Sequence, residues 1–113
     1  MKVINFFGAP GVGKTRSTML LTAHMKEVGV DVEASLEVVK EYIHTKNYNL
    51  LNYQHYIFAQ QDRQLQILQD SNEVEFAITD APLLHSIQYG QEMYPFSYQE
   101  LVFDFFNAYD NIN

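Results

Sequence analysis

The segment GAPGVGKT, residues 8–15, constrains the fold of this chain more than any other feature. It follows a short apolar run, Val3 to Phe7, which is typical of a buried strand. A helical pattern begins at Lys14 and is carried by residues at spacings of four and three, namely Ser17, Leu21, Met25 and Val28. The sequence therefore predicts a strand, a glycine-rich loop and a helix in direct succession.

Four residues of this segment, Gly8, Gly13, Lys14 and Thr15, satisfy the pattern G-x-x-x-x-G-K-[ST]. Glycine lets the backbone wrap closely around phosphate oxygens, and the amides of the first helical turn point at the anion. Lys14 can reach the outer phosphates, and the Thr15 hydroxyl can bind Mg²⁺. The alternative is a glycine-rich turn with an incidental lysine, but the flanking strand and helix favour phosphate binding. We expect the following residues to bind ATP or another nucleoside triphosphate: Gly8, Ala9, Pro10, Gly11, Val12, Gly13, Lys14, Thr15 and Arg16.

A carboxylate directly follows another short apolar run, where Asp80 comes after Phe76–Thr79. The carboxyl end of a strand faces the edge at which ligands bind in open parallel sheets. Asp80 is therefore our second candidate ligand for Mg²⁺, with Thr15. The alternative is that Asp80 caps a helical segment that begins at Pro82, and the two roles are compatible.

The remaining pattern alternates short strands with helices. We expect a second strand at 30–33, helices at 37–45, 53–69, 83–91 and 97–109 with Ser97 as the last N-cap, and a frayed tail at 110–113. Such alternation favours a short parallel sheet of three strands in a three-layer α/β/α fold. The length of 113 residues allows a single domain, 1–113.

Composition narrows the classes of partner. The formal net charge of −7 opposes general binding to nucleic acid or to anionic membranes. The absence of cysteine excludes disulfides and cysteine–metal sites, and no targeting segment or transmembrane stretch is visible. These features fit a cytoplasmic protein.

Four segments in this order, GAPGVGKT, VEASLEVVKEYI, YIFAQQDRQLQIL and FAITDAPLLHSIQYG, resemble a group of small P-loop NTPases that are often phage-borne. Members are described as AAA-type ATPases or as thymidylate- and adenylate-kinase-like proteins. The resemblance covers Met1 to about Gly90. It implies a kinase-like, ATP- and magnesium-binding P-loop domain with a Walker A motif.

The resemblance also implies roles outside the loop. Glu37 matches an acidic residue that, in the related kinases, acts as general base toward the acceptor hydroxyl or orients it. Glu33 and Glu41 compete for this role, and a surface position early in a helix is the alternative. Arg63 and Gln61 match residues of the long helix. An arginine fork suits a phosphate and an amide suits a base edge, whereas a solvated helix face is the ordinary alternative.

The chain departs from the group in two respects. Ala81 replaces the usual serine after the aspartate, and no Lys or Arg follows Gly90, so no arginine-bearing lid can be read from the sequence. We therefore expect the domain to be incomplete relative to the group. The exposed edge of the first strand would be covered by residues 101–106, by a second copy or by another chain.

Two functions follow as hypotheses. In the first, Lys14, Glu37 and Arg63 are catalytic and a phosphoryl group passes from ATP to a nucleoside or nucleotide. In the second, the chain is a nucleotide-binding regulatory or interaction module without efficient transfer. The four histidines show no metal-binding spacing and are interpreted as ordinary helix residues, namely His24, His44, His55 and His85.

Overall fold

The structure is a computed structural model that describes residues 1–9, 12–37, 53–90 and 94–113. Its strands form one parallel sheet in the order β2-β3-β1-β4. The strands are β1 (Lys2–Asn5), β2 (Val32–Ser35), β3 (Phe76–Thr79) and β4 (Asp110–Ile112). The helices are α1 (Lys14–Glu27), α3 (Gln54–Asp70), α4 (His85–Gly90) and α5 (Phe96–Asn107).

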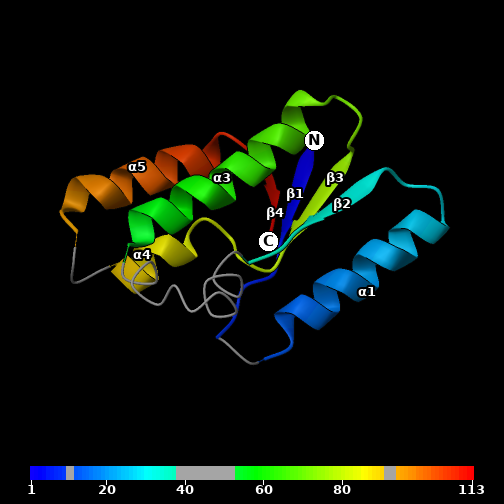
Figure 1. Ribbon diagram of the computed structural model, residues 1–113, viewed down its shortest axis with the longest axis horizontal. Coiled ribbons are helices and arrows are strands. Elements are labelled where there is room, and N and C mark those ends of the chain that lie inside the picture. The colour runs from blue at the N-terminus through cyan, green and yellow to red at the C-terminus, as the bar shows by residue number, and fades with distance from the viewer. Residues whose placement is uncertain (10–11, 38–52, 91–93) are drawn as a thin grey trace.

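The helices lie on both faces of the sheet. Figure 1 shows α1 on one face and α3, α4 and α5 on the other. The expected α/β class with a short parallel sheet is confirmed, and the arrangement is compatible with three layers. In the described part of the chain, no helix has the length and apolarity needed to cross a membrane.

The core lies between the sheet and the three helices on that second face. Val3 and Ala77 point from the sheet toward Phe58 of α3 and Val102 of α5 within one buried cluster. Aromatic rings join the two helices, because Phe58 contacts Tyr98 at a ring separation of 6.1 Å. These side chains bury large areas, which helps a domain of this size to form a stable core.

The strand predictions hold with shifts at the boundaries. The third strand is confirmed at Phe76–Thr79, and the first lies one to two residues earlier than expected. The second strand was expected at 30–33 and is observed at Val32–Ser35. The strand begins later because the amide of Val30 donates to the Met25 carbonyl at the end of α1, at 3.0 Å, and so still belongs to the turn that ends this helix.

The prediction of a frayed tail is wrong, because Asp110–Ile112 forms β4 and pairs in parallel with β1. The buried amide of Asn5 donates to the side-chain oxygens of Asn111 at 3.0 Å and Asn113 at 3.1 Å. Asn111 in turn donates to the Phe106 carbonyl at the end of α5, at 2.8 Å. Polar side chains therefore hold this strand, and the sheet has four strands rather than three. β4, not residues 101–106, covers the edge of β1.

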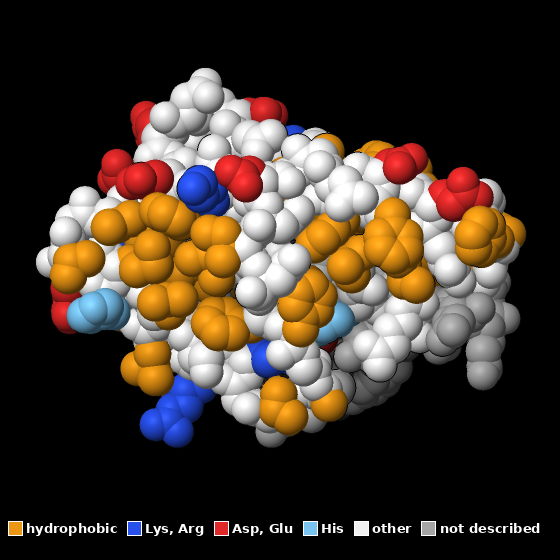
Figure 2. Space-filling model, turned by 180° about the vertical axis from the view of Figure 1, so that it is seen from behind, with side chains coloured by type: hydrophobic (Ala, Val, Ile, Leu, Met, Phe, Trp, Pro, Cys, Tyr) orange, Lys and Arg blue, Asp and Glu red, His pale blue; other side chains and the backbone are white. Residues whose placement is uncertain are grey.

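Two helix details also differ from expectation. In α1 the buried residues are Thr18 and Thr22. The residues whose spacing predicted the helix are half-exposed or exposed, namely Ser17, Leu21, Met25 and Val28. Apolar side chains such as Met19 and Leu20 face outward, and Figure 2 shows hydrophobic side chains gathered over α1. The last helix begins at Phe96, so Ser97 lies inside its first turn and is not the N-cap. The expected helix at 37–45 lies outside the described residues, apart from Glu37.

A buried polar pair joins the end of the chain to α3. The Tyr109 hydroxyl donates to Oδ1 of Asp62 at 2.7 Å, and Gln66 Nε2 donates to the other carboxylate oxygen at 2.9 Å. Burial raises the pKa of Asp62, and the hydrogen bond from Tyr109 partly offsets this rise. The pair thus secures the segment that leads into β4.

We predict that Tyr109→Phe lowers the free energy of unfolding by about 1–3 kcal/mol, because it leaves a buried carboxylate oxygen without its donor. Tyr53→Phe is the matched control, since Tyr53 is exposed, and its effect should stay within about 0.5 kcal/mol. Urea denaturation at pH 7 measures both values. Equal effects of the two substitutions would contradict the structural role of the Tyr109 hydroxyl.

Candidate functional site

Strand register brings the predicted site residues to one edge of the sheet. β3 lies between β1 and β2, and its last residue, Thr79, is paired with Asn5 on one side and Ser35 on the other. Because the three strands are parallel, the segments that follow them leave the sheet at the same edge. Thr15, Glu37 and Asp80 therefore come together although they are far apart in sequence.

The Asp80 carboxylate is the centre of this cluster and is only 1% exposed. One oxygen, Oδ2, accepts a hydrogen bond from the Thr15 hydroxyl at the start of α1. The other, Oδ1, accepts the backbone N–H of Glu37 at 2.8 Å. Both oxygens are thus engaged by the loop–helix junction and by the segment after β2.

The oxygen atoms of Thr15 and Asp80 suit Mg²⁺ by their chemistry, because this ion prefers hard oxygen ligands. Among the described residues, no group of three or more His, Cys, Asp or Glu side chains could hold a metal ion. A magnesium ion held by Thr15 and Asp80 would therefore take its other ligands from water and phosphate oxygens, as this ion commonly does.

Two glycines of the loop have a positive φ, which glycine adopts more readily than other residues. Gly13 precedes α1 with φ of 90°, and Gly8 has φ of 150°. A Cβ atom on Gly8 would lie 2.9 Å from Cγ2 of Val12. The ammonium group of Lys14 folds back to the Gly8 carbonyl at 2.7 Å, so the lysine lies over the loop.

For the other predicted loop residues, the structure gives only their exposure or does not describe them. Ala9, Val12 and Arg16 are exposed. Pro10 and Gly11 lie outside the described residues. The exposure of this side of the loop leaves it open to a ligand from solvent.

A small cavity of about 40 Å³ adjoins the Asp80 cluster. Its walls come from the segment after β2, from α3 and from the turn into α4, and they include Glu37, Gln61 and His85. Gln61 is 4% exposed, and its Nε2 donates to the Leu36 carbonyl at 3.4 Å. Its Oε1 has no hydrogen-bond partner among the described residues. One of the residues that line the cavity therefore carries a buried acceptor atom with no described partner.

His85, which the sequence interpretation treated as an ordinary helix residue, lines this cavity. Its ring packs edge-on against Phe7 with 5.7 Å between centroids, beside the loop. Burial and the nearby Lys14 charge lower the pKa of His85, while Asp80 acts in the opposite direction. The only available signal was its position five residues after Asp80, and this carries no chemical meaning until the turn into α4 is known.

Arg63 does not join the site. It is exposed and lines a hollow between α3 and α5, whereas Gln61 lines the cavity beside Glu37. Residues two positions apart on an α-helix are separated by about 200° around its axis, so the side chains of Gln61 and Arg63 point to opposite sides of α3. Of the acids that competed with Glu37, Glu33 forms an ion pair with Lys26 at 3.1 Å, and Glu41 lies outside the described residues.

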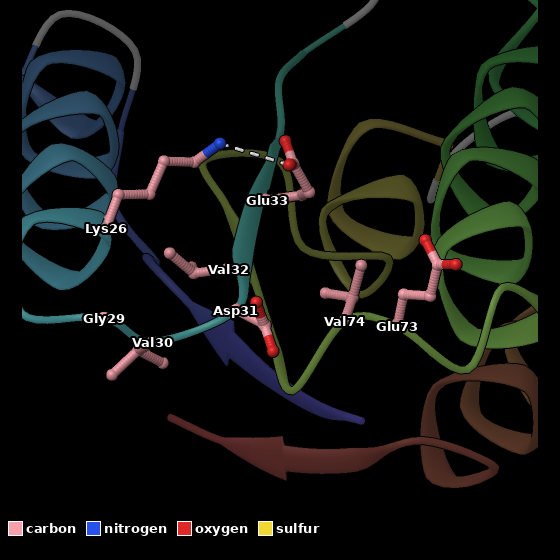
Figure 3. A pocket seen from close by; sticks show the side chains of 8 residues that line it. All are labelled: Lys26, Gly29, Val30, Asp31, Val32, Glu33, Glu73 and Val74. Atoms are coloured by element: carbon pink, nitrogen blue, oxygen red, sulfur yellow. Dashed lines mark hydrogen bonds and ion pairs between the residues drawn. The ribbon is translucent and has the colours of Figure 1, made fainter.

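A second hollow, of about 410 Å³, lies at the amino end of β2 and is lined by residues that include Asp31, Glu33 and Glu73. Figure 3 shows Lys26 reaching from α1 toward Glu33 on β2. This hollow is at the opposite end of the sheet from Asp80. Its carboxylates make it unsuited to a phosphate ligand.

Comparison of the chain with protein families, with curated proteins and with solved structures gave no match. A functional interpretation of this chain therefore depends on its motif and on the geometry of the Asp80 cluster.

We predict that Gly8→Ala weakens binding of a triphosphate by tenfold or more, because the new methyl group would meet Val12 and distort the loop. Backbone strain at a positive φ also costs about 1–3 kcal/mol of stability. Gly29→Ala is the control, since its φ of 86° gives strain but its Cβ meets nothing within 4 Å.

Isothermal titration with ATP and Mg²⁺ compares these variants. Adding Val12→Ala to Gly8→Ala removes the clashing atom, so part of the affinity should return. If Gly29→Ala weakened ATP binding as much as Gly8→Ala, the effect would reflect general strain and not the shape of the loop.

Proposed function

We propose that this chain is a kinase-like P-loop NTPase that binds ATP with Mg²⁺ and transfers a phosphoryl group to a nucleoside or nucleotide. Lys14 and the loop amides hold the triphosphate, and Thr15 and Asp80 hold the metal ion. Glu37 and the adjoining cavity receive the acceptor. Arg63 has no part in this proposal, because it lies on the other side of α3.

One observation carries the proposal. The Asp80 carboxylate lies at the end of β3 and contacts the Thr15 hydroxyl at the end of the loop motif. A P-loop threonine and a strand-end aspartate are the pair of side chains that hold Mg²⁺ beside a triphosphate in P-loop NTPases. The contact between these two residues, 65 positions apart in sequence, supports the proposal.

The position of Glu37 supports the transfer step. Its backbone N–H is fixed to Asp80 at 2.8 Å, and its side chain lines the cavity next to the loop. A carboxylate there is within the same site as the phosphate-binding loop and can accept the proton of an acceptor hydroxyl. The attacking oxygen would form the new P–O bond to the terminal phosphorus of ATP while the bond from that phosphorus to the leaving nucleoside diphosphate breaks.

The second candidate is a nucleotide-binding regulatory module, and the size of the cavity favours it. About 40 Å³ is far below the roughly 300–1,000 Å³ of typical small-molecule sites. No Lys or Arg follows Gly90 in the sequence, so that stretch supplies no charge to stabilise a transferring phosphoryl group. Under this alternative, ATP binds and no acceptor is phosphorylated.

The first test is a mass-resolved assay of the chain with ATP, Mg²⁺ and a panel of nucleosides and nucleoside monophosphates. We expect a product heavier by one phosphate, and Lys14→Ala should abolish it, because the lysine supplies the only loop ammonium. ATP binding without product would support the regulatory module instead. Unchanged ATP affinity in Lys14→Ala would show that the phosphate site is assigned wrongly.

A second prediction separates catalysis from binding. Glu37→Gln removes the carboxylate but keeps the backbone N–H that holds Asp80, so ATP affinity should stay within about twofold. Loss of a general base should lower kcat by about 100-fold or more. Glu33→Gln is the control, since Glu33 pairs with Lys26 away from the site. Equal rates for both variants would exclude Glu37 as the base.

A further inference from the structure

A groove runs between α3 and α5, away from the Asp80 cluster. Two hollows, of about 350 and 540 Å³, share Asp62, Gln66 and Phe105 as lining residues and so adjoin one another. Figure 1 shows the two helices side by side. Phe58 near the start of α3 packs against Tyr98 near the start of α5. Asp62, further along α3, bonds Tyr109, which lies two residues beyond the end of α5, so the helices run in the same direction.

One part of the groove is apolar. Phe58 is buried at its base and contacts Phe105 at a ring separation of 5.4 Å. Leu101 and Phe105 form its rim and remain 45% and 37% exposed. An exposed phenylalanine ring and an exposed leucine, both next to the buried Phe58 ring, form a surface that can bind an apolar side chain.

The other part is negative for two independent reasons. Asp70 and Asp104 line it and form no ion pair with any described residue. The carboxyl ends of α3 and α5 lie in the same direction, and neither helix has a basic residue in its last turn. The helix dipoles therefore add to the side-chain charge there. No Lys or Arg is among the described residues that line this part, and Arg63 lines the apolar part instead.

Asp62, at the base of the groove, does not share in this role. Its two carboxylate oxygens already accept hydrogen bonds from Tyr109 and Gln66. The charges that face a bound segment are thus those of Asp70, at the end of α3, and of Asp104, about one helical turn beyond Leu101 on α5.

We propose that this groove docks a basic amphipathic segment of a partner protein. An apolar side chain of that segment sits between Leu101 and Phe105 over Phe58, and a Lys or Arg about one turn away faces Asp70 and Asp104. A second copy of this chain is a poor occupant, because a two-fold contact would bring the same carboxylates together. The inference is independent of the nucleotide site, which lies on the other side of α3.

The charge arm of the test uses a labelled 18-residue amphipathic helix with leucines on one face and lysines on the other. Its partner peptide has glutamate at every lysine position. We expect the lysine peptide to bind by fluorescence anisotropy and the glutamate peptide not to bind. The double variant Asp70→Asn/Asp104→Asn should bind at least fivefold more weakly.

The matched control is Glu73→Gln/Glu75→Gln, which removes the same charge elsewhere on the surface and should change affinity less than twofold. Equal losses in the two double variants would mean general attraction to an acidic protein, and this outcome would overturn the proposal. Absence of binding by the lysine peptide would overturn it as well.

The apolar arm compares Leu101→Gln on the groove with Leu20→Gln on α1, which is also exposed. Only Leu101→Gln should weaken peptide binding, by fivefold or more. Sedimentation of the chain alone tests the rival occupant. Self-association that Leu101→Gln abolishes would show that a second copy fills the groove, and the proposed partner segment would be wrong.

Discussion

The parallel pairing of β3 between β1 and β2 is the constraint on which the site depends. Its register places Thr79 beside both Asn5 and Ser35, so three following segments leave the sheet together. The Asp80 carboxylate then fixes their positions, because it accepts one bond from Thr15 and one from Glu37. A one-residue slip of β3 would turn Asp80 away from the loop and separate both contacts.

Some of this arrangement could be predicted from sequence and some could not. The loop motif, the strand at Phe76–Thr79 and its terminal aspartate carry local signals, since each depends on neighbouring residues alone. β4 has no such local signal. Its polar residues form a strand because they pair with β1, which lies about a hundred residues earlier in the chain and carries Asn5, the donor to Asn111 and Asn113. The position of Arg63, away from the Asp80 cluster, could not be predicted either, because it also depends on tertiary packing. Resemblance assigns a residue to a helix, whereas only packing decides which side of that helix faces the site.

The packing of α3 explains how one helix serves two surfaces. Gln61 faces the cavity beside Glu37, and the next residue, Asp62, faces the groove toward α5. Both are buried, and each is held by a different segment, Leu36 in one case and Tyr109 in the other. The two surfaces therefore share a rigid element but no side chain. The partner segment that we propose for the groove and the nucleotide that we propose for the loop would therefore not compete for contacts.

The negative charge beside the loop affects whether the proposed nucleotide would bind with or without a metal ion. The net charge is −7, and Asp80 is buried beside the loop that we propose to hold a triphosphate. A buried carboxylate next to phosphate oxygens is repulsive unless a cation lies between them. Lys14 is a single positive charge and is directed at the loop carbonyl of Gly8. We therefore infer that Asp80 favours binding of the nucleotide only with Mg²⁺ and opposes binding of the free anion.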